Sequence, residues 1–313
     1  MSSERKITLL SGGTGTPKLI EGFDELENVK MTVIANTGDD WSFYGLHVSP
    51  DVDAVLFALS GYLDKEKYWG IDNDTFNAVS FLKEMKEDVW FNLGDKDTGL
   101  CLLRTNMLQT GLDLTAVTAE LSKRLGIEHT VLPMCNERVE CRFKTNKGDL
   151  HLEEFWIREH GSPEVYEQYL KNIENARVTQ RVKEAIATAE LIIIGPSNPV
   201  SSIGPILAVP GMKEFINSSP AEKCCVSPII GEKPFSGPAA QFLQASGFEV
   251  SPFGVAKFYE GVISKIFIHE TDGEQYTDKI AELGIEVVPV NILMRSEEDK
   301  FRLADFIMKE CLS

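Results

Sequence analysis

The residues of this chain whose types and spacing can carry out chemistry are aspartates and glycine-rich turns. Four aspartates fall within a window of 15 residues: Asp39, Asp40, Asp51 and Asp53. Carboxylate oxygens bind Mg²⁺, which keeps several of its waters and bridges substrate phosphates. One carboxylate of such a group can also take the proton of an attacking hydroxyl. We therefore take Asp51 and Asp40 as candidate catalytic residues and as candidate Mg²⁺ ligands.

A structural interpretation competes with the functional one for these aspartates. Ser49 and Pro50 are typical of the N-cap and the first residue of a helix. Asp51 would then lie in the first helical turn, where a carboxylate also stabilises the helix dipole. Asp53 fits a solvated helix surface better than a site.

A second acidic pair flanks a lysine, with Asp95 and Asp97 on either side of Lys96. Lys96 would either form a surface ion pair or direct its cation at a substrate, and both interpretations stay open. His47 precedes the Asp51 segment and fits an ordinary loop residue. The chain contains no G-x-S-x-G motif and no convincing Cys/His pair, so covalent catalysis is disfavoured.

A glycine-rich turn lies near the start of the chain, directly after an apolar run. Its candidate phosphate-binding residues are Gly12, Gly13, Thr14, Gly15 and Thr16. Glycines let bare backbone N–H groups approach an anion, and the N-terminus of the following helix adds partial positive charge. The turn lacks the Gly-Lys-Ser/Thr of a P-loop, and Lys18 stands where the dinucleotide fingerprint needs its third glycine. The alternative is an ordinary strand-to-helix turn.

Two later segments, 195–199 and 236–238, repeat this construction. Each follows an apolar strand and precedes a helix, so a parallel sheet would bring all three turns to one edge. Three turns rich in Gly, Ser and Pro favour a ligand with several phosphates. The further candidate contacts are Asn36, Ser197, Asn198, Ser201 and Ser202.

Alternating apolar strands and helices predict the fold class. We expect an α/β protein with a doubly wound, mostly parallel, Rossmann-like sheet and an inserted helical and β-meander subdomain. Besides the opening strand, the predicted strands of the sheet are 31–36, 190–199, 225–230 and 285–290.

The predicted insertion separates the two parts of the core. We expect the core to comprise residues 1–61 and 176–313, and the insertion, 62–175, to form a lid or substrate subdomain. Within and beside it, residues 62–125 read as mostly helical, 130–160 as a β-meander, and 163–174 and 180–189 as helices. A closing helix is predicted for 296–312.

Composition limits the compartment and the partners. The formal net charge of −17 gives no long-range attraction to nucleic acid or to an anionic membrane. No apolar run approaches the ~20 residues of a membrane helix, and no signal peptide is recognisable. The six cysteines show no zinc-binding spacing and fit a reducing compartment. We expect a cytoplasmic protein with no nucleic-acid or membrane partner, and we consider a homodimer as its assembly.

A series of motifs along the chain resembles one family. In order they are SGGTGTPKL, NTGDD, SPDVDAVL, WGIDNDTF, LGDKD, LPM, IIIGPSNPVSSIGPIL, VSPIIGEKPFSGPA and GVAKFY. This set resembles the 2-phospho-L-lactate transferase family of archaea, which acts in the biosynthesis of the deazaflavin coenzyme F420.

The resemblance implies a reaction and some of its residues. A phospholactyl group would pass from lactyl-2-diphospho-5'-guanosine to the ribityl hydroxyl of the deazaflavin FO, GMP would leave, and Mg²⁺ would be required. The resemblance also implies that Asp51 and Lys96 contact FO, although many relatives have Arg in place of Lys96. The glycine turn and the segment 195–199 would hold the guanosine diphosphate moiety.

Two other functions stay open at this stage. A non-enzymatic, sugar-nucleotide-binding regulator of the same superfamily would share the glycine turn but would not need an aromatic FO site. A nicotinamide-dependent oxidoreductase would need the missing third glycine and an acidic residue in place of Asn36 at the end of the second strand. The three-carbon acid that is carried, lactate or phosphoenolpyruvate, is not defined by the sequence.

Overall fold

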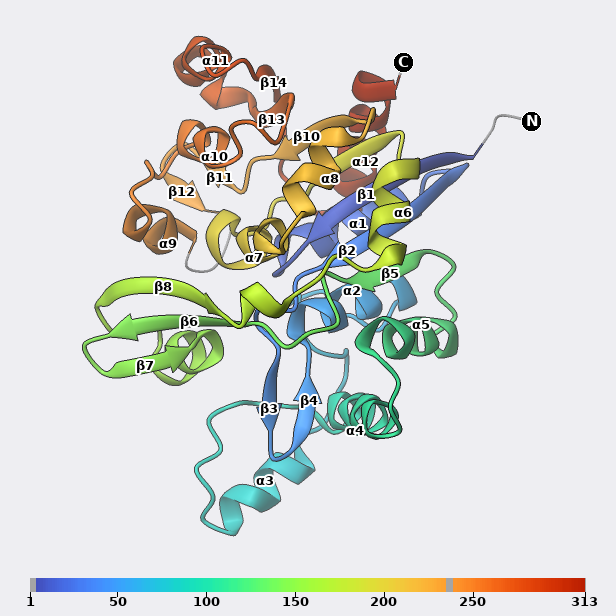
Figure 1. Ribbon diagram of the computed structural model, residues 1–313, viewed down its shortest axis with the longest axis vertical. Coiled ribbons are helices and arrows are strands. Elements are labelled where there is room, and N and C mark those ends of the chain that lie inside the picture. The colour runs from blue at the N-terminus through green and yellow to red at the C-terminus, as the bar shows by residue number, and fades with distance from the viewer. Residues whose placement is uncertain (1–3, 235–238, 313) are drawn as a thin grey trace.

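A central parallel sheet organises the computed structural model, which describes residues 4–234 and 239–312 (Figure 1). In spatial order its seven strands are β14 (Glu286–Val290), β13 (Lys265–His269), β10 (Glu222–Val226), β9 (Leu191–Ile194), β1 (Arg5–Ser11), β2 (Val29–Ala35) and β5 (Thr130–Pro133). All neighbouring pairs are parallel. The predicted α/β fold with a doubly wound parallel sheet is therefore confirmed.

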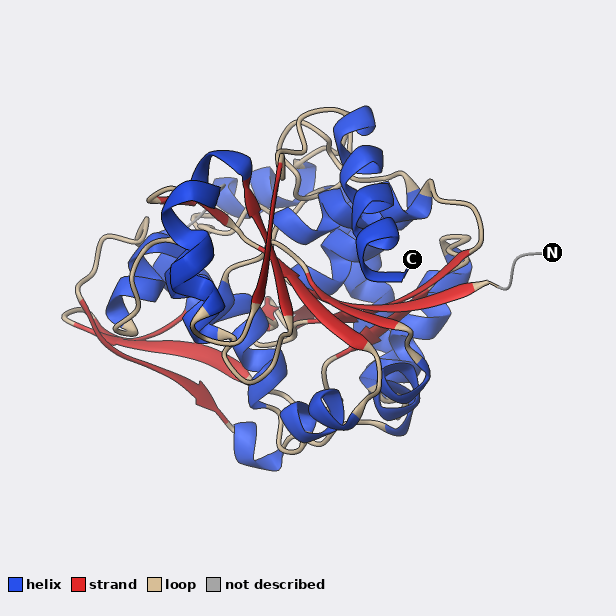
Figure 2. Ribbon diagram, turned by 90° about the horizontal axis from the view of Figure 1, so that it is seen from above, coloured by secondary structure: helices blue, strands red, loops and turns tan. Residues whose placement is uncertain are grey.

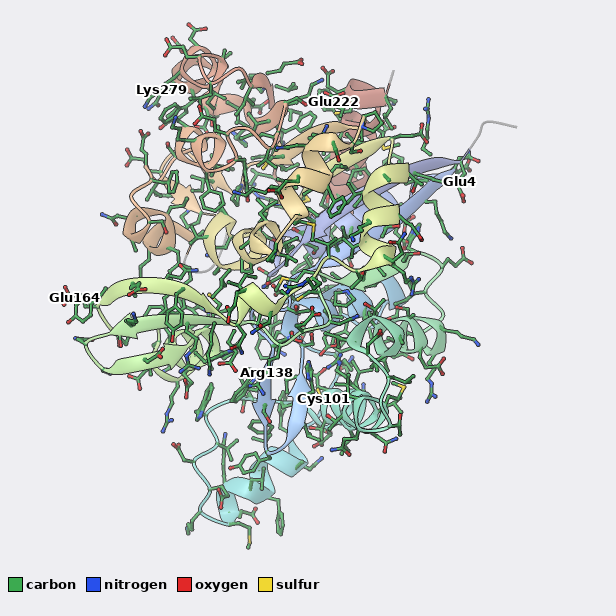
Figure 3. The ribbon with its side chains drawn as sticks, viewed as in Figure 1. Glu4, Cys101, Arg138, Glu164, Glu222 and Lys279 are labelled. Atoms are coloured by element: carbon green, nitrogen blue, oxygen red, sulfur yellow. The ribbon has the colours of Figure 1, made fainter. Side chains whose placement is uncertain are left out.

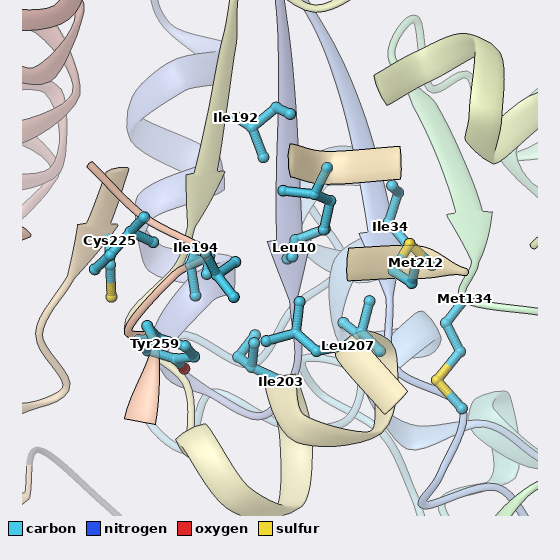
Figure 4. Close-up of a cluster of buried hydrophobic side chains, with 14 of the residues drawn as sticks. Leu10, Ile34, Met134, Ile192, Ile194, Ile203, Leu207, Met212, Cys225 and Tyr259 are labelled. Atoms are coloured by element: carbon cyan, nitrogen blue, oxygen red, sulfur yellow. The ribbon is translucent and has the colours of Figure 1, made fainter. Parts of the chain in front are cut away.

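Helices cover both faces of this sheet (Figure 2). One face packs against α6 (Gln180–Thr188), α7 (Gly204–Ala208), α8 (Met212–Ser218), α10 (Pro252–Phe258) and α11 (Gly273–Ala281). The other packs against α1 (Gly15–Asp24), α2 (Pro50–Ser60), α4 (Asp95–Gln109), α5 (Leu114–Arg124) and α12 (Glu297–Leu312). Successive strand residues serve opposite faces, so Leu9 belongs to one core and Leu10 to the other. Figure 4 shows Leu10 and Ile194 beside Ile203 and Leu207 in the first core.

The strand order reverses at β1, and this reversal positions the site. From β1 the chain first builds β2 and β5 on one side, and later builds β9, β10, β13 and β14 on the other. In open parallel sheets, ligands bind outside the carboxyl ends of the strands at such a switch point. The turns that follow β1 and β9 therefore lie side by side, as the sequence predicts.

Smaller elements extend from the carboxyl edge of the sheet (Figure 1). The hairpin of β3 (Trp41–Phe43) and β4 (Leu46–Val48) leads toward α3 (Asn77–Glu84). A second sheet has the order β7 (Gly148–His151), β6 (Glu140–Thr145), β8 (Val165–Lys171). Two short strands, β11 (Ile229–Ile230) and β12 (Lys233–Pro234), and the helix α9 (Ala239–Ala245) lie between β10 and α10 in the chain.

Several sequence predictions for these elements are wrong. Residues 165–171 form a strand and not a helix, because pairing with β6 outweighs the helical preference of Glu, Gln, Leu and Lys. The first strand of the predicted meander is β5, which pairs with β2 in the central sheet. Its last segment turns into a π-helix at Glu154–Arg158. The strand β13 was not predicted. Although β5 lies within 62–175, the boundaries of the insertion stay a prediction.

No helix in the described ranges is long and apolar enough to cross a membrane. The predicted turn at 236–238 lies outside the described residues. The cytoplasmic location and the homodimer stay predictions.

Candidate active site

The turns after β1 and β9 interlock through glycines. A Cβ on Gly15 would overlap with the carbonyl oxygen of Pro196, and a Cβ on Gly195 would overlap with the side chain of Thr16. The hydroxyls of Thr16 and Ser197 are hydrogen-bonded at 2.6 Å. Both glycines are thus required for the close approach of the two turns, in addition to any approach of backbone to a phosphate.

The first two glycines of the turn direct their N–H groups into the protein. Gly13 has a φ of +58°, and its N–H donates to Asp51 Oδ1 at 2.7 Å. The N–H of Gly12 donates to Ser197 Oγ at 3.3 Å. A phosphate would therefore be held by the N-terminus of α1, which begins at Gly15 and whose first N–H groups lack intrahelical acceptors.

Asp51 lies directly behind the glycine turn. Its Oδ2 accepts a hydrogen bond from Asn36 Nδ2 at 2.9 Å, and Asn36 Oδ1 accepts one from the N–H of Gly38. Burial raises the pKa of Asp51 to about 6, against the opposing hydrogen bonds from Asn36 and Gly13. Asn36 therefore orients Asp51, and Asp51 orients the turn.

Asp39 is the acidic residue that the sequence interpretation passed over in favour of its neighbour. It lines a cavity at the switch point, is 6% exposed, and its Oδ1 has no hydrogen-bond partner among the described residues. Burial raises the pKa of Asp39 well above its usual range, and the nearby carboxylates of Asp51 and Glu153 raise it further. Among the described residues, Asp39 Oδ1 is the carboxylate oxygen best suited to bind a cation, because Asp39 lines the cavity and this atom has no hydrogen-bond partner.

Asp40 faces a different environment. Ser49 Oγ donates to Asp40 Oδ1 at 2.6 Å, and His47 Nε2 lies 2.8 Å from Asp40 Oδ2. Asp40 lines a separate cavity of about 320 Å³, next to His47 and Arg138, which Figure 3 labels. Both oxygens of Asp40 are occupied within the protein, so its catalytic and metal-binding roles stay predictions. Ser49 is the N-cap residue of α2 and Pro50 its first residue, as the sequence suggested, but the Ser49 hydroxyl bonds Asp40 and makes no capping bond to the helix.

A cavity of about 770 Å³ lies at the switch point. On one side it is lined by predicted nucleotide contacts: Gly13, Thr14, Gly15, Ser197, Asn198, Ser201 and Ser202. Elsewhere its wall is aromatic, with Phe57, Trp69, Trp90, Phe91 and Trp156. Asn198 Oδ1 accepts from the N–H of Val200, whereas its Nδ2 is buried without a partner in the described chain. The cavity thus combines phosphate-binding chemistry with flat apolar surfaces suited to a ring system.

The lysine of the second acidic segment lies outside this wall. Lys96 is exposed, and its Nζ donates to the carbonyl oxygen of Asp72 at 3.0 Å. Asp95 is structural, because it accepts hydrogen bonds from Thr75 and Ala78 at the start of α4. Asp97, the next acidic residue, lines the cavity. The FO contact of Lys96 stays a prediction.

Asp53 is not on a solvated helix surface, as the sequence suggested. It is buried and forms an ion pair with Arg104, whose side chain is 0% exposed. Arg104 Nη1 donates to Asp53 Oδ2 at 3.0 Å, and its Nη2 donates to Oδ1. Burial raises the pKa of Asp53, and the Arg104 charge opposes that rise. This pair fixes α2 to α4 at the cavity wall.

The donor set for a metal is small. Within residues 4–234 and 239–312, no group of three or more His, Cys, Asp or Glu side chains is placed to hold a metal ion. Mg²⁺ does not need such a cage, because it is commonly held by one or two carboxylates together with substrate phosphates and waters. Asp39 and Asp51, which are in hydrogen-bonding contact, fit that requirement.

The switch-point turns and the cavity define an α/β protein with a Rossmann-like sheet and a cavity of ligand size at its switch point. The model of the family "2-phospho-L-lactate transferase CofD" matches residues 7–305, and the chain belongs to this family. It is therefore a transferase, and the family resemblance seen in the sequence is confirmed.

Individual relatives extend over nearly the whole chain. The 2-phospho-L-lactate transferases of Methanopyrus kandleri and Methanosarcina acetivorans are 40% and 38% identical to it, over 97% and 96% of this chain and 97% of each relative. That of Methanocaldococcus jannaschii is 38% identical over 97% of this chain and 98% of its own. Protein BH3568 from Bacillus halodurans has a similar fold, with a TM-score of 0.66 and 21% identity over 98% of this chain and all of its own.

Proposed function

We propose that this protein transfers a 2-phospho-L-lactyl group from lactyl-2-diphospho-5'-guanosine to the ribityl hydroxyl of FO, releasing GMP, in the biosynthesis of coenzyme F420. The observation that carries the proposal is the composite cavity. Its phosphate-binding side matches a diphosphate donor, and its aromatic wall matches a flat deazaflavin. The names of the relatives supply the transferred group.

The donor would lie along the two switch-point turns. Its diphosphate would accept hydrogen bonds from the N-terminus of α1 and from the hydroxyls of Ser201 and Ser202, with Asn198 Nδ2 as a further donor. Ser197 would act indirectly, because its hydroxyl already bonds Thr16 and Gly12. These contacts hold the donor without forming a covalent intermediate.

Mg²⁺ belongs to the proposal, with Asp39 and Asp51 as its protein ligands. Bound there, it would neutralise charge on the diphosphate and on the leaving phosphate. The protein itself orients the Asp51 carboxylate, through Asn36 and the N–H of Gly13. Walls formed by Trp69, Trp90 and other aromatics would exclude water, which would otherwise compete with the acceptor hydroxyl.

A turnover assay tests this function directly. The purified protein is mixed with FO, Mg²⁺ and either the lactyl or the phosphoenolpyruvyl diphosphoguanosine, and GMP release is measured by chromatography. We expect stoichiometric formation of GMP and phospholactyl-FO, with the lactyl donor preferred. Absence of transfer with both donors would refute the proposal.

FO binding separates the enzyme from the regulator of the same superfamily. FO fluorescence should be quenched on binding to the aromatic wall, and Trp69→Ala and Trp90→Ala should weaken that quenching. A sugar-nucleotide-binding regulator would bind its nucleotide but leave FO fluorescence unchanged. Sedimentation of the same preparation tests the homodimer.

A further inference from the structure

One acidic side chain of the cavity wall, that of Asp97, takes no part in the proposed binding of the donor or of the metal. Asp97 lies in the first turn of α4 and lines the cavity together with Asp53, Gly70 and Leu93. Gly70 comes close to it, because a Cβ on Gly70 would lie 3.5 Å from Asp97 Oδ2. Asp97 therefore belongs to an element separate from both switch-point turns.

The neighbouring carboxylates are committed to the fold, and this distinguishes Asp97 from them. Both carboxylate oxygens of Asp53 accept hydrogen bonds from the terminal nitrogens of Arg104. Asp74 accepts the N–H groups of Thr75, Lys96 and Asp97 itself. Each of these oxygens already has a strong donor, so neither group is ready to bind a substrate hydroxyl.

Asp97 accepts a hydrogen bond from the backbone of Gly94, the N-cap residue of α4. The two residues occupy the positions of a capping box, in which the third helical residue returns to the N-cap N–H. One carboxylate oxygen suffices for that bond. The second oxygen remains for a ligand in the cavity that Asp97 lines.

The charges around Asp97 suit it to exchange a proton near neutral pH. Burial, together with the carboxylates of Asp53 from α2 and Asp74 from the preceding loop, raises the pKa of Asp97 to about 7. The Gly94 N–H and the Arg104 guanidinium oppose this rise. A general base is most efficient when its pKa lies near the working pH.

We propose that Asp97 is the general base that accepts the proton of the acceptor hydroxyl. The hydroxyl oxygen forms a bond to the phosphorus that carries the lactyl group, and its proton passes to the Asp97 carboxylate. The bond from that phosphorus to the bridging oxygen breaks, and GMP leaves with the electron pair. This assignment rests on the proposed function, because it requires a hydroxyl acceptor.

Kinetics of Asp97→Asn test the assignment. The amide oxygen of Asn can still accept the Gly94 N–H, so the variant should fold with a near-native melting temperature. We expect kcat to fall by about 10²–10⁴-fold, with GDP affinity unchanged. We also expect the rise of kcat with pH, centred near 7 in the wild type, to disappear. The acceptor's own ionisation is common to all variants and does not alter this comparison.

Two matched variants complete the test. Asp95→Asn, in the same helical turn, removes a structural carboxylate and should lower the melting temperature while the pH profile is kept. Asp97→Glu retains an acid and should recover part of kcat. If Asp97→Asn turns over within a few-fold of the wild type with the same pH profile, the assignment is overturned while the function stands.

A readout without substrate separates the remaining outcomes. In infrared difference spectra, the wild-type protein should show a carboxyl band that titrates near pH 7 and is lost in Asp97→Asn. Absence of that band overturns the assignment even if the variant is slow. Wild-type protein that fails to transfer overturns the proposed function, and the assignment with it.

Discussion

Removing Arg104 while keeping Asp53 perturbs the buried ion pair at the cavity wall. The guanidinium is fully buried between α2 and α4, and it also donates to the carbonyl oxygen of His47 at 3.3 Å. Arg104→Met keeps the apolar stem and removes the charge. The carboxylate of Asp53 is then left buried without its cation.

The structure determines the size of this effect. Breaking a buried, hydrogen-bonded pair by removing one partner costs about 3–5 kcal/mol. Unfolding entropy of about 2.1 cal/mol/K per residue near 60 °C, taken over 313 residues, converts this to a fall in Tm of roughly 5–8 °C. Asp53→Asn/Arg104→Met should recover most of the loss, because no charge then remains buried.

The loss should depend on pH in a defined direction. Burial already raises the pKa of Asp53 in the wild type, and loss of Arg104 raises it further. The folded variant therefore binds the Asp53 proton at pH values where the unfolded chain has released it, so its stability falls as pH rises. The deficit relative to wild type should be small at acid pH, where Asp53 is neutral in both folded proteins. It should grow as pH rises from the folded-state pKa of Asp53 in the wild type to the higher pKa in the variant.

Thermal unfolding of the wild type, both single variants and the double variant at pH 5 and pH 8 provides the measurement. Circular dichroism follows the melt, and urea titrations give the free energies for a double-mutant cycle. An Arg104→Met deficit below about 1 kcal/mol, the range of exposed ion pairs, would refute the reasoning. An equal deficit at both pH values would refute the pH argument.

Three further predictions concern the binding and catalytic groups. Gly15→Ala should lower both the melting temperature and GDP affinity in calorimetric titration, because its Cβ overlaps with the backbone of Pro196; unchanged values would exclude the interlocked turns. Asp51→Asn should keep a near-native melting temperature and strongly reduce turnover, because it removes a proposed Mg²⁺ ligand; loss of stability alone would leave it a helix-terminus residue. EDTA should abolish transfer and Mg²⁺ should restore it, whereas full activity in EDTA would remove the metal role of Asp39 and Asp51.

Local sequence signals predict the parts of the fold that depend on neighbours along the chain. The run Leu191–Ile194 is apolar at every position, as expected for a strand buried on both faces. The glycines after β1 and before Pro196 predict the two turns at the switch point, which is also a local signal. By contrast, β8 depends on pairing with β6, whose residues lie 20 to 31 positions before their partners, and four of its seven residues (Glu, Gln, Leu and Lys) favour a helix.

The site shows the same division between local and distant information. The cluster of aspartates is visible in the sequence, but the difference between Asp39 and Asp40 is not, because adjacent residues face opposite directions. Asp39 turns to the cavity while Asp40 bonds Ser49 and His47. The burial of Asp53 depends on Arg104, 51 residues away. Contacts in the folded structure, which the sequence does not show, therefore determine which of these carboxylates is available for chemistry.

The central position of β1 has a consequence for synthesis on the ribosome. β1 pairs with β2 early, but its other edge must wait for β9, whose first residue is Leu191. α1, which follows the glycine-rich turn, packs against α12, where Gly22 lies against the backbone of Lys300. Until translation reaches these segments, an apolar strand edge stays open to other chains. We therefore expect this protein to complete its site only after α12 has left the ribosome, and its yield to depend on chaperones more than that of proteins with local contacts.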